Sequence, residues 1–418
     1  MKIIVHRGTH QIGGSCIELA TENTRIILDI GQELPSIDET EFQNKSQLPQ
    51  VKGLYNGGEK AIDALFISHY HGDHVGLIGN VHPDVPIYIG EKAAKILNMT
   101  AQFTGSKACV SPAGYLVSGQ EIKVGDFSIV PYLVDHSAFD AYAFVIYAEN
   151  KCIVYTGDIR EHGKKKLSTY FFRQKLPKEI DALLIEGTMM GRTTEVIETE
   201  EQIEQKAYDF MVSRKDRPIF VIQSSANIDR LVGMYRATKR SGRIFVMDIF
   251  TANIVSQVGG RIPNPYTFKD VRVFYPFHLT RRMFKEPDGK ELMKQFSQHL
   301  ISRKELGERK DYCMLVRDTM LSDLQHINNL EGAGIIYSMW SGYLKTERLE
   351  RMMNYAAKMN MEIIHLHTSG HAGIKTLQNI AKSCSPERII PIHTEYPERF
   401  IDKFANVVIV NDNEAIFI

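Results

Sequence analysis

The sequence predicts an α/β protein in which a strand-rich domain is interrupted by an inserted domain of alternating strands and helices. Up to about residue 190, short apolar strands are separated by Gly and Pro. Between residues 198 and 338, strand and helix patterns alternate, which is typical of a parallel sheet. Strand patterns that contain histidine return at 363–367 and 389–393. The strand-rich domain is therefore predicted to be discontinuous.

These changes in pattern define the expected domain boundaries. The strand-rich domain is predicted to comprise residues 1–194 and 346–418, and the inserted α/β domain residues 195–345. With 418 residues, the chain exceeds what one hydrophobic core usually supports. A hydrophobic content of 43% is ordinary for a globular protein.

Charge and cysteine content exclude some classes of protein. Fifty basic and fifty acidic residues give no net charge, so the whole molecule is not a polycation that binds nucleic acid. Five scattered cysteines without a C-x-x-C pair argue for reduced thiols. The sequence contains no signal-peptide core and no apolar run long enough to span a bilayer. We expect a cytoplasmic protein.

The segment after the predicted strand 64–67 is the most informative in the chain. It reads Ser-His-Tyr-His-Gly-Asp-His and provides His69, His71, Asp73 and His74. Neutral imidazoles and carboxylates at the end of a strand are the ligands that a pair of divalent metal ions requires. A polar surface turn would explain one histidine but not four ligand-type residues at this spacing.

Three further candidate ligands, His136, Asp158 and His393, each follow a predicted strand. Because the ends of neighbouring strands converge on one edge of a sheet, residues distant in sequence can share a metal site. Asp29 has the same placement and suits an indirect role, in which it orients a ligand histidine through the free ring nitrogen.

In this order, Asp29, the turn 68–74, His136 and Asp158 resemble the metallo-β-lactamase superfamily. Three additional signals resemble its nucleic-acid-processing branch, the β-CASP group that includes RNase J. They are Glu186 at the end of a strand, His371 in an S-G-H-A turn and His393 in a P-x-H-x-E turn. The resemblance covers nearly the whole chain. It implies a metallo-β-lactamase αββα sandwich with an inserted β-CASP domain, and a histidine at 393 resembles the RNA-processing members more than the DNA-repair members.

The resemblance also implies roles for the ligands. One divalent metal ion would be held by His69, His71 and His136, and a second by Asp73, His74 and His393, with Asp158 between them. Zinc is expected first, and manganese stays open because histidine and carboxylate ligands serve both. Asp73 and Asp158 would thus take part in catalysis.

The same resemblance makes His371 the candidate general acid and Glu186 the group that fixes its tautomer. The alternative is that His371 is a structural turn residue and Glu186 a charge at a helix N-terminus.

Substrate-binding candidates fall into three groups. His367, Ser369 and Gly370 precede His371 in a turn that could hold a phosphate. Ser225 and Asn227 open a predicted helix and would either contact an anion or cap the helix. Arg160 and the lysines 164–166 follow Asp158 and would either guide phosphates or form a solvated loop.

The leading prediction is a two-metal ribonuclease that hydrolyses single-stranded RNA in a cleft between the two domains, as a 5′-end-sensing exonuclease, an endonuclease or both. The chain ends at Ile418, so we expect the C-terminal domain of RNase J to be absent, which leaves the oligomeric state and processive action open.

Three alternatives remain. They are a single-stranded DNA nuclease, a hydrolase of a thioester or lactone, and a non-catalytic scaffold of an RNA-processing complex. The small-molecule hydrolase leaves Glu186, His371 and the insertion without a purpose. A scaffold would be expected to lose ligands, whereas this chain keeps all seven.

Overall fold

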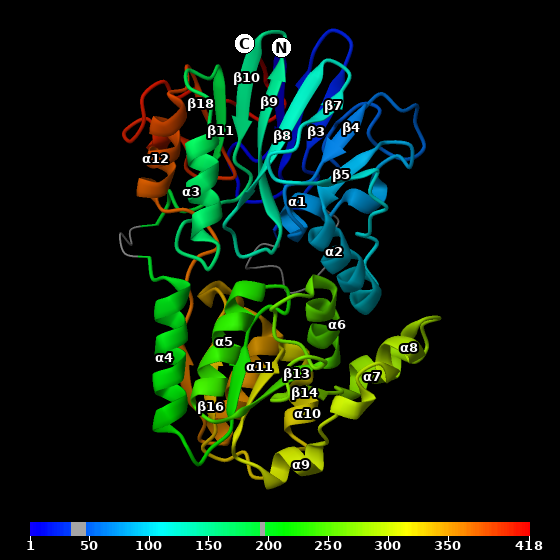
Figure 1. Cartoon of the computed structure of the whole chain (residues 1–418), viewed down its shortest axis with the longest axis vertical. Coiled ribbons are helices and arrows are strands. Elements are labelled where there is room, and N and C mark those ends of the chain that lie inside the picture. The colour runs from blue at the N-terminus through cyan, green and yellow to red at the C-terminus, as the bar shows by residue number, and fades with distance from the viewer. Residues whose placement is uncertain (35–46, 193–196) are drawn as a thin grey trace. The chain divides into compact units, whose positions relative to one another are not determined.

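The computed structural model describes residues 1–34, 47–192 and 197–418. They form two compact units (Figure 1). Of the described residues, those up to Ile197 and Ser369–Ile418 form the first unit, and Glu198–Thr368 form the second. None of the helices in the described part of the chain is long and apolar enough to cross a membrane.

The first unit contains a seven-stranded and a six-stranded sheet. The larger sheet has the order β19-β1-β2-β3-β4-β5-β6, with β1 (Lys2–Arg7), β2 (Cys16–Ala20), β3 (Arg25–Leu28), β4 (Ala64–Phe66), β5 (Ile87–Gly90), β6 (Gly114–Leu116) and β19 (Ala415–Phe417). The smaller sheet has the order β18-β11-β10-β9-β8-β7, with β7 (Ile122–Val124), β8 (Phe127–Val134), β9 (Ala141–Ala148), β10 (Lys151–Tyr155), β11 (Ala182–Glu186) and β18 (Ile389–Ile392).

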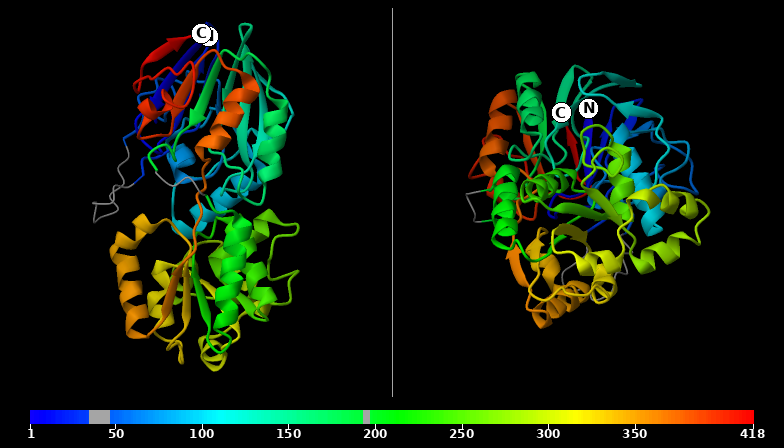
Figure 2. Two further views of the ribbon diagram at one scale, coloured as in Figure 1. Left: turned by 90° about the vertical axis from the view of Figure 1, so that its left-hand side faces the viewer. Right: turned by 60° about the horizontal axis from the view of Figure 1, so that its bottom comes forward.

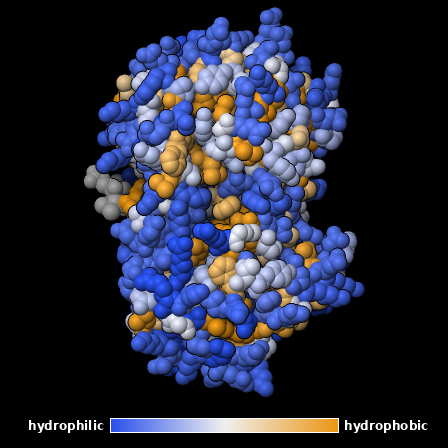
Figure 3. Space-filling view, in the orientation of Figure 1, coloured by the Kyte–Doolittle hydropathy of each residue, from blue (hydrophilic) through white to orange (hydrophobic). Residues whose placement is uncertain are grey.

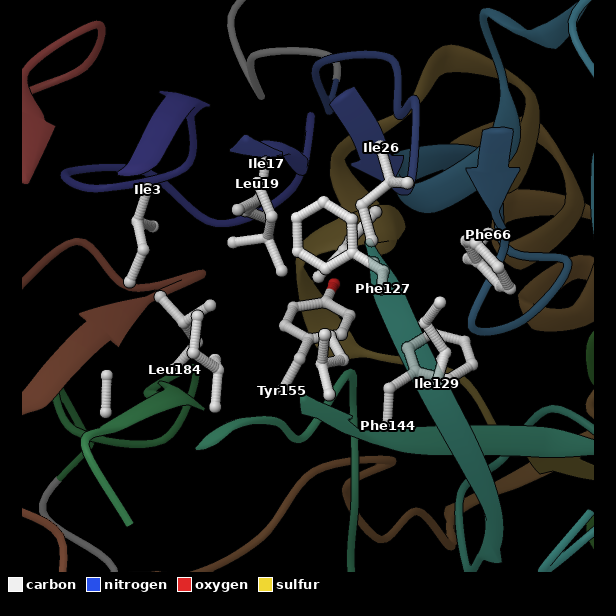
Figure 4. Close-up of a cluster of buried hydrophobic side chains, with 14 of the residues drawn as sticks. Ile3, Ile17, Leu19, Ile26, Phe66, Phe127, Ile129, Phe144, Tyr155 and Leu184 are labelled. Atoms are coloured by element: carbon white, nitrogen blue, oxygen red, sulfur yellow. The ribbon is translucent and has the colours of Figure 1, made fainter. Parts of the chain in front are cut away.

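The two sheets pack face to face over one hydrophobic core. Figure 4 shows Ile3, Leu19 and Ile26 of the larger sheet pointing toward Phe144 and Leu184 of the smaller one. These side chains are fully buried. Successive residues of a strand point to opposite faces, and many of the intervening residues are also apolar, so each sheet has a second apolar face on its outer side.

Helices cover these outer faces. On the smaller sheet, α3 (Lys166–Lys175) and α12 (Ile374–Cys384) contribute Phe172, Leu377 and Ile380 to a second core. On the larger sheet, α2 (Glu91–Thr104) packs against β5, and the short α1 (Gly72–Val75) follows β4 (Figure 1). The predicted αββα sandwich is confirmed.

The two ends of the chain meet in the first unit (Figure 2). Strand β19 pairs with β1 in antiparallel register, with Ile3 opposite Ile416. The amino group of Met1 donates a hydrogen bond to the carbonyl oxygen of Ile418 at 3.3 Å.

The second unit is a parallel α/β layer. Its six strands have the order β14-β13-β15-β12-β16-β17, and every neighbouring pair is parallel. The strands are β12 (Ile219–Ile222), β13 (Ile244–Asp248), β14 (Val271–Phe274), β15 (Tyr312–Val316), β16 (Gly334–Tyr337) and β17 (Glu362–His365). The helices are α4 (Glu200–Ser213), α5 (Ile228–Arg240), α6 (Ile249–Val258), α7 (Phe277–Met283), α8 (Gly289–Lys294), α9 (Arg303–Glu308), α10 (Leu321–Leu324) and α11 (Glu347–Lys358). Helix α11 packs its Leu349 and Met352 on one face of this sheet, and α5 and α6 contact β13.

The second expected domain boundary requires a correction. The sequence placed it after residue 345, but the second unit extends to Thr368. Strand β17 pairs with β16, with Ile335 opposite Ile363, and α11 covers the same sheet. The two histidines in 363–367 favour the strand-rich domain, but the pairing of a strand with its neighbours is not visible in such a pattern. The first expected boundary, between residues 194 and 195, lies outside the described residues.

Candidate metal centre

Sharp backbone turns aim the candidate ligands at one edge of the sandwich. Asp29 and His393 directly follow β3 and β18, and both adopt a left-handed backbone, with φ of 59° and 51°. Gly157 does the same after β10, with φ of 51°. Such a conformation is uncommon for residues other than glycine and costs free energy. It changes the direction of the backbone at the point where each of these strands ends.

The turn 68–74 is held by the backbone of neighbouring segments. The carbonyl oxygens of Asp73 and His74 accept hydrogen bonds from the amides of Ser15 and Ile30 at 3.0 and 2.8 Å. Gly31 lies so close that a Cβ atom there would be 1.8 Å from the carbonyl oxygen of Asp73. A residue without a side chain is therefore required at position 31.

Among the described residues, three groups of potential ligands lie at this edge, and the third, which comprises Asp158, Glu186, His371 and His393, overlaps the second. The first cluster consists of His69, His71 and His136. One nitrogen of each ring lies within 4.8 Å of the others. Nε2 of His136 is 3.1 Å from Nδ1 of His71. Three ring nitrogens that converge in this way could hold one divalent ion.

The second cluster consists of Asp73, His74, Asp158 and His393. Nε2 of His393 lies 3.2 Å from Oδ2 of Asp73, and Nε2 of His74 lies 3.3 Å from Oδ2 of Asp158. The same oxygen of Asp158 is 3.8 Å from Nε2 of His69 and of His136 in the first cluster. Asp158 thus lies between the two clusters, where a shared ligand would be needed.

Hydrogen bonds on the far side of the rings orient four of the histidines. In each ring Nδ1 takes part in a hydrogen bond and Nε2 faces the cluster. The Nδ1 partners are Ser68 Oγ for His69 (3.0 Å), Asp29 Oδ2 for His74 (2.8 Å), the Gly370 carbonyl oxygen for His136 (2.7 Å) and Thr188 Oγ1 for His393 (2.8 Å). Asp29 has the orienting position expected from the sequence. Its carboxylate also accepts hydrogen bonds from Ser68 and from the Tyr155 hydroxyl.

Sequence reasoning did not identify Ser68, Thr188 and Tyr155 as supports. Ser68 adjoins the histidine-rich turn, which is a usable signal. Tyr155 ends an ordinary strand, β10, and Thr188 lies in the turn after β11, so only the fold reveals their contacts.

The centre contains buried polar atoms with no hydrogen-bond partner. They are Nε2 of His69 and of His74, both carboxylate oxygens of Asp158 and Nδ1 of His371. Burying such groups without a partner is costly, and metal coordination removes that cost. The donor atoms and their convergence fit divalent metal ions.

Electrostatics favour neutral imidazoles in the first cluster. Burial and the neighbouring histidines hold the pKa of His69 well below its usual range, and burial lowers the pKa of His71 to about 4. Burial likewise lowers the pKa of His136. At neutral pH these rings are uncharged, which is the form that binds a metal.

His74 behaves in the opposite way. Burial opposes its charge, but Asp158 and Asp29 outweigh this effect and raise its pKa well above the usual value. A proton on Nε2 would occupy the position of a metal, so metal binding should release it.

His371 and Glu186 lie beside the second cluster. Nδ1 of His371 is 3.4 Å from Oε2 of Glu186 and 3.5 Å from Oδ2 of Asp158. Glu186 is fully buried and accepts hydrogen bonds from the amides of Ile159, Thr188 and Ala372. The His371 side chain retains 20% exposure although its Nδ1 atom is buried, so the opposite edge of the ring meets solvent.

Arg160 does not line the mouth of the site, which corrects the expectation from the sequence. Its side chain is fully buried, its Nε lies 3.2 Å from Oδ1 of Asp135, and its guanidinium donates to the Ser369 carbonyl. The sequence favours a phosphate contact for Arg160 because it follows Asp158, but in the structure Arg160 pairs with Asp135, the residue before His136. Arg160 therefore braces the loop that carries His136.

Ser369 and Gly370 form hydrogen bonds with other residues of the first unit. The Ser369 hydroxyl accepts a hydrogen bond from the amide of His371 at 3.1 Å, and the Gly370 carbonyl accepts from His136. The Ser369 hydroxyl is buried and donates to Met189 Sδ at 3.3 Å, so it is engaged within the first unit, and the phosphate cradle expected at this turn stays a prediction.

Ser225, Asn227 and His367 belong to the second unit. Asn227 caps α5 by accepting from the amide of Arg230 at 3.1 Å, which was the structural alternative at this position. The Ser225 hydroxyl accepts from Thr251 Oγ1 at 2.8 Å and is buried. The His367 ring stacks on His365.

Family models match two segments of the chain. Residues 12–187 match the metallo-β-lactamase superfamily, and residues 356–408 match a "Zn-dependent metallo-hydrolase RNA specificity domain". The first match contains six of the seven candidate ligands, and the second contains His371 and His393.

Several curated relatives are named Ribonuclease J. The protein from Sinorhizobium meliloti is 23% identical over 376 residues, which cover 87% of this chain and 62% of that protein. The protein from Pyrococcus abyssi is 21% identical over 433 residues, which cover 95% of this chain and 90% of that protein. The chain spans only 56% of the Helicobacter pylori protein. A solved structure of a protein of unknown function from Enterococcus faecalis has a TM-score of 0.81, 25% identity and 99% coverage of both chains.

The αββα sandwich and the ligand-bearing strand ends define a metallo-β-lactamase-type metallo-hydrolase fold. Residues 12–187 form a metallo-β-lactamase domain, and over most of its length the chain is RNase J-like.

Proposed function

We propose that this protein is a two-metal ribonuclease that hydrolyses phosphodiester bonds of single-stranded RNA. The observation that carries the proposal is the convergence of two ligand clusters on Asp158, with the His371–Glu186 pair beside them. A protein that used one metal, or none, would not require seven ligand-type residues at adjoining strand ends.

The residues fit two divalent ions. His69, His71 and His136 would hold one, Asp73, His74 and His393 the other, and Asp158 would contact both. When bound, such a pair lowers the pKa of water and neutralises charge on the phosphate. Zinc is our first choice, and manganese remains compatible with these ligands.

His371 would protonate the leaving oxygen. Its Nδ1–H faces Glu186 and Asp158, so the proton available for transfer is on Nε2, at the exposed edge of the ring. Glu186 is fixed by three backbone amides, so it holds the orientation of His371 throughout the reaction. Before the transfer the ring carries hydrogens on both nitrogens and is positively charged; after it gives the Nε2 proton to the leaving oxygen, His371 would be neutral, with its remaining Nδ1–H facing the carboxylates.

RNA as the substrate class is supported by the comparisons. The RNA specificity match at 356–408 and the Ribonuclease J relatives both favour RNA over a thioester or lactone. The complete ligand set argues against a non-catalytic scaffold. The Ser369 hydroxyl accepts from the His371 amide and donates to Met189, so a preference for one kind of 5′ end would have to come from other groups.

The deciding experiment compares products from RNA, single-stranded DNA and duplex of one sequence, each with a 5′-monophosphate, triphosphate or hydroxyl. We expect single-stranded RNA to be cleaved and duplex to resist. Cleavage of single-stranded DNA at the same rate would show a nuclease for single strands of either kind and would contradict specificity for RNA. No cleavage of any polymer would contradict the proposal as a whole. The first products from labelled RNA distinguish end-directed from internal cutting.

A further inference from the structure

Helix α3 exposes apolar side chains that the fold does not need. Leu167, Tyr170 and Phe171 are 62%, 44% and 59% exposed. They are separated by three and four residues and therefore share one face of the helix. Phe172, on the opposite face, is buried in the core against the sheet. A cluster of large apolar side chains in water marks a binding surface.

The same layer of the first unit is basic. Helix α3 contains Lys166, Arg173 and Lys175, its neighbour α12 contains Lys375 and Lys382, and neither helix contains an acidic residue. Figure 1 shows the two helices side by side on the smaller sheet, and Figure 3 shows apolar atoms exposed among hydrophilic ones over this region. In a chain without net charge, this local excess favours a polyanion.

The aromatic rings are held in place. The rings of Tyr170 and Phe171 lie 5.6 Å apart at an interplanar angle of 69°. The guanidinium of Arg173 lies 5.6 Å from the centre of the Tyr170 ring and donates a hydrogen bond to Glu161 at 2.9 Å. Arg173 thus positions Tyr170, and its charge is already partly used by Glu161.

Helix α3 is joined directly to the metal centre. Its first turn contains Thr169, whose hydroxyl accepts from the amide of Asp135 at 2.8 Å. Lys165, which precedes the helix, donates to the carbonyl of the candidate ligand His136 at 3.1 Å. The exposed face of α3 therefore begins next to the loop that carries His136, within the same unit.

We propose that the α3 face, defined as Lys166, Leu167, Tyr170, Phe171 and Lys175, binds the part of a single-stranded RNA that lies outside the metal centre. Unpaired bases stack on Tyr170 and Phe171, and the phosphates contact the lysines. Bases in a duplex are hidden from such rings, so the surface selects single strands. This inference rests on the proposed ribonuclease function and identifies how a long substrate is held.

The test compares full-length variants in equilibrium binding to a fluorescent single-stranded RNA, with metal ligands intact. Tyr170→Ala combined with Phe171→Ala should weaken binding roughly five- to 150-fold for each stacked base. Lys166→Gln combined with Lys175→Gln should reduce the slope of log affinity against log salt by about 0.7 for each lost phosphate contact.

Matched controls come from the same unit. Tyr115 is 50% exposed and the side chain of Lys123 is 75% exposed, and they lie on β6 and β7, outside α3. Tyr115→Ala and Lys123→Gln should leave RNA affinity and salt dependence unchanged. All variants should hydrolyse bis(p-nitrophenyl) phosphate at the wild-type rate, because this small diester does not reach α3.

Unchanged RNA affinity in both α3 variants, with RNA still cleaved, would overturn this inference and leave the ribonuclease proposal intact. Failure of the wild-type protein to cleave RNA would instead contradict the proposed function. A second copy of the chain could cover this face instead, and sedimentation tests this alternative. If the wild-type protein is a dimer, the Tyr170/Phe171 variant is a monomer and RNA affinity does not change, the face is a protein interface and the RNA inference is wrong.

Discussion

Nδ1 of His371 lies 3.4 Å from Oε2 of Glu186. A buried carboxylate on one edge of an imidazole, with the other edge exposed, is the arrangement that a proton donor requires. Burial opposes a charge on His371, but Asp158 and Glu186 outweigh it and raise its pKa to about 9.

We therefore predict that His371→Ala retains bound metal but loses about 10²- to 10⁴-fold in the rate of RNA cleavage. Metal analysis and single-turnover cleavage of the same samples check this. If the variant loses metal in proportion to activity, His371 is a ligand and not a proton donor.

Glu186→Gln should shift the pH dependence in a defined direction. A general acid must be protonated, so activity falls as the pH rises through its pKa. Removing the charge of Glu186 lowers the pKa of His371, and the high-pH limb of the rate profile should move to lower pH. A profile displaced upward, or one unchanged in position, would exclude this coupling.

Substitutions in the second cluster should separate the two metals. Asp73→Asn or His74→Ala should reduce the metal content toward one ion per chain and abolish cleavage, because His69, His71 and His136 remain available for one ion. His278 is exposed in the second unit, and His278→Ala provides the control. Full activity with half the metal would eliminate the two-metal mechanism.

Asp29 should affect metal affinity without being a ligand. It accepts hydrogen bonds from His74, Ser68 and Tyr155, so Asp29→Asn leaves at least one of these groups without its acceptor. We expect a loss of about 10- to 100-fold in affinity, measured by competition with a chelator. Tyr155→Phe removes only one donor and should have a smaller effect; equal affinities in all three proteins would refute the orienting role.

Arg160 should contribute to stability and not to RNA binding. Arg160→Ala removes the guanidinium that pairs with the buried Asp135 carboxylate, and the loss of one member of a buried ion pair typically costs about 3 to 5 kcal/mol. The exposed pair of Arg309 with Asp311 is the control, and Arg309→Ala should cost at most about 1 kcal/mol. Urea unfolding measures both. A stable Arg160→Ala protein with weak RNA affinity would restore the substrate role expected from the sequence.

Glu18 should make the first unit sensitive to acid. Burial opposes its charge, but hydrogen bonds from His6 and Arg25 lower its pKa from 4.5 to about 2. Because the folded-state pKa is depressed, this stabilisation is present above pH 4.5 and is lost as the pH falls toward 2. It amounts to about 3 kcal/mol. In Glu18→Gln, unfolding curves should lose this component of the pH dependence; a parallel dependence in both proteins would contradict it.

The ligand-bearing strand ends could be predicted because the ligands follow apolar strands in the sequence, as His136 follows β8 and Asp158 follows β10. The partners of buried polar groups could not be predicted in this way. Arg160 pairs with Asp135 from another strand end, and the carbonyl that orients His136 belongs to Gly370, more than two hundred residues away. For the same reason, the pattern of β17 does not predict its domain, since its pairing with β16 depends on the neighbouring strand and not on its own residues.

Metal removal and reconstitution test the central claim most directly. Wild-type protein is stripped with a chelator, checked for folding by circular dichroism, and assayed on single-stranded RNA before and after the addition of zinc or manganese. We predict a folded, inactive protein that regains RNA cleavage as it binds two ions per chain. Cleavage that persists in the stripped, metal-free protein, or a protein with two bound ions that leaves single-stranded RNA intact, would contradict the account.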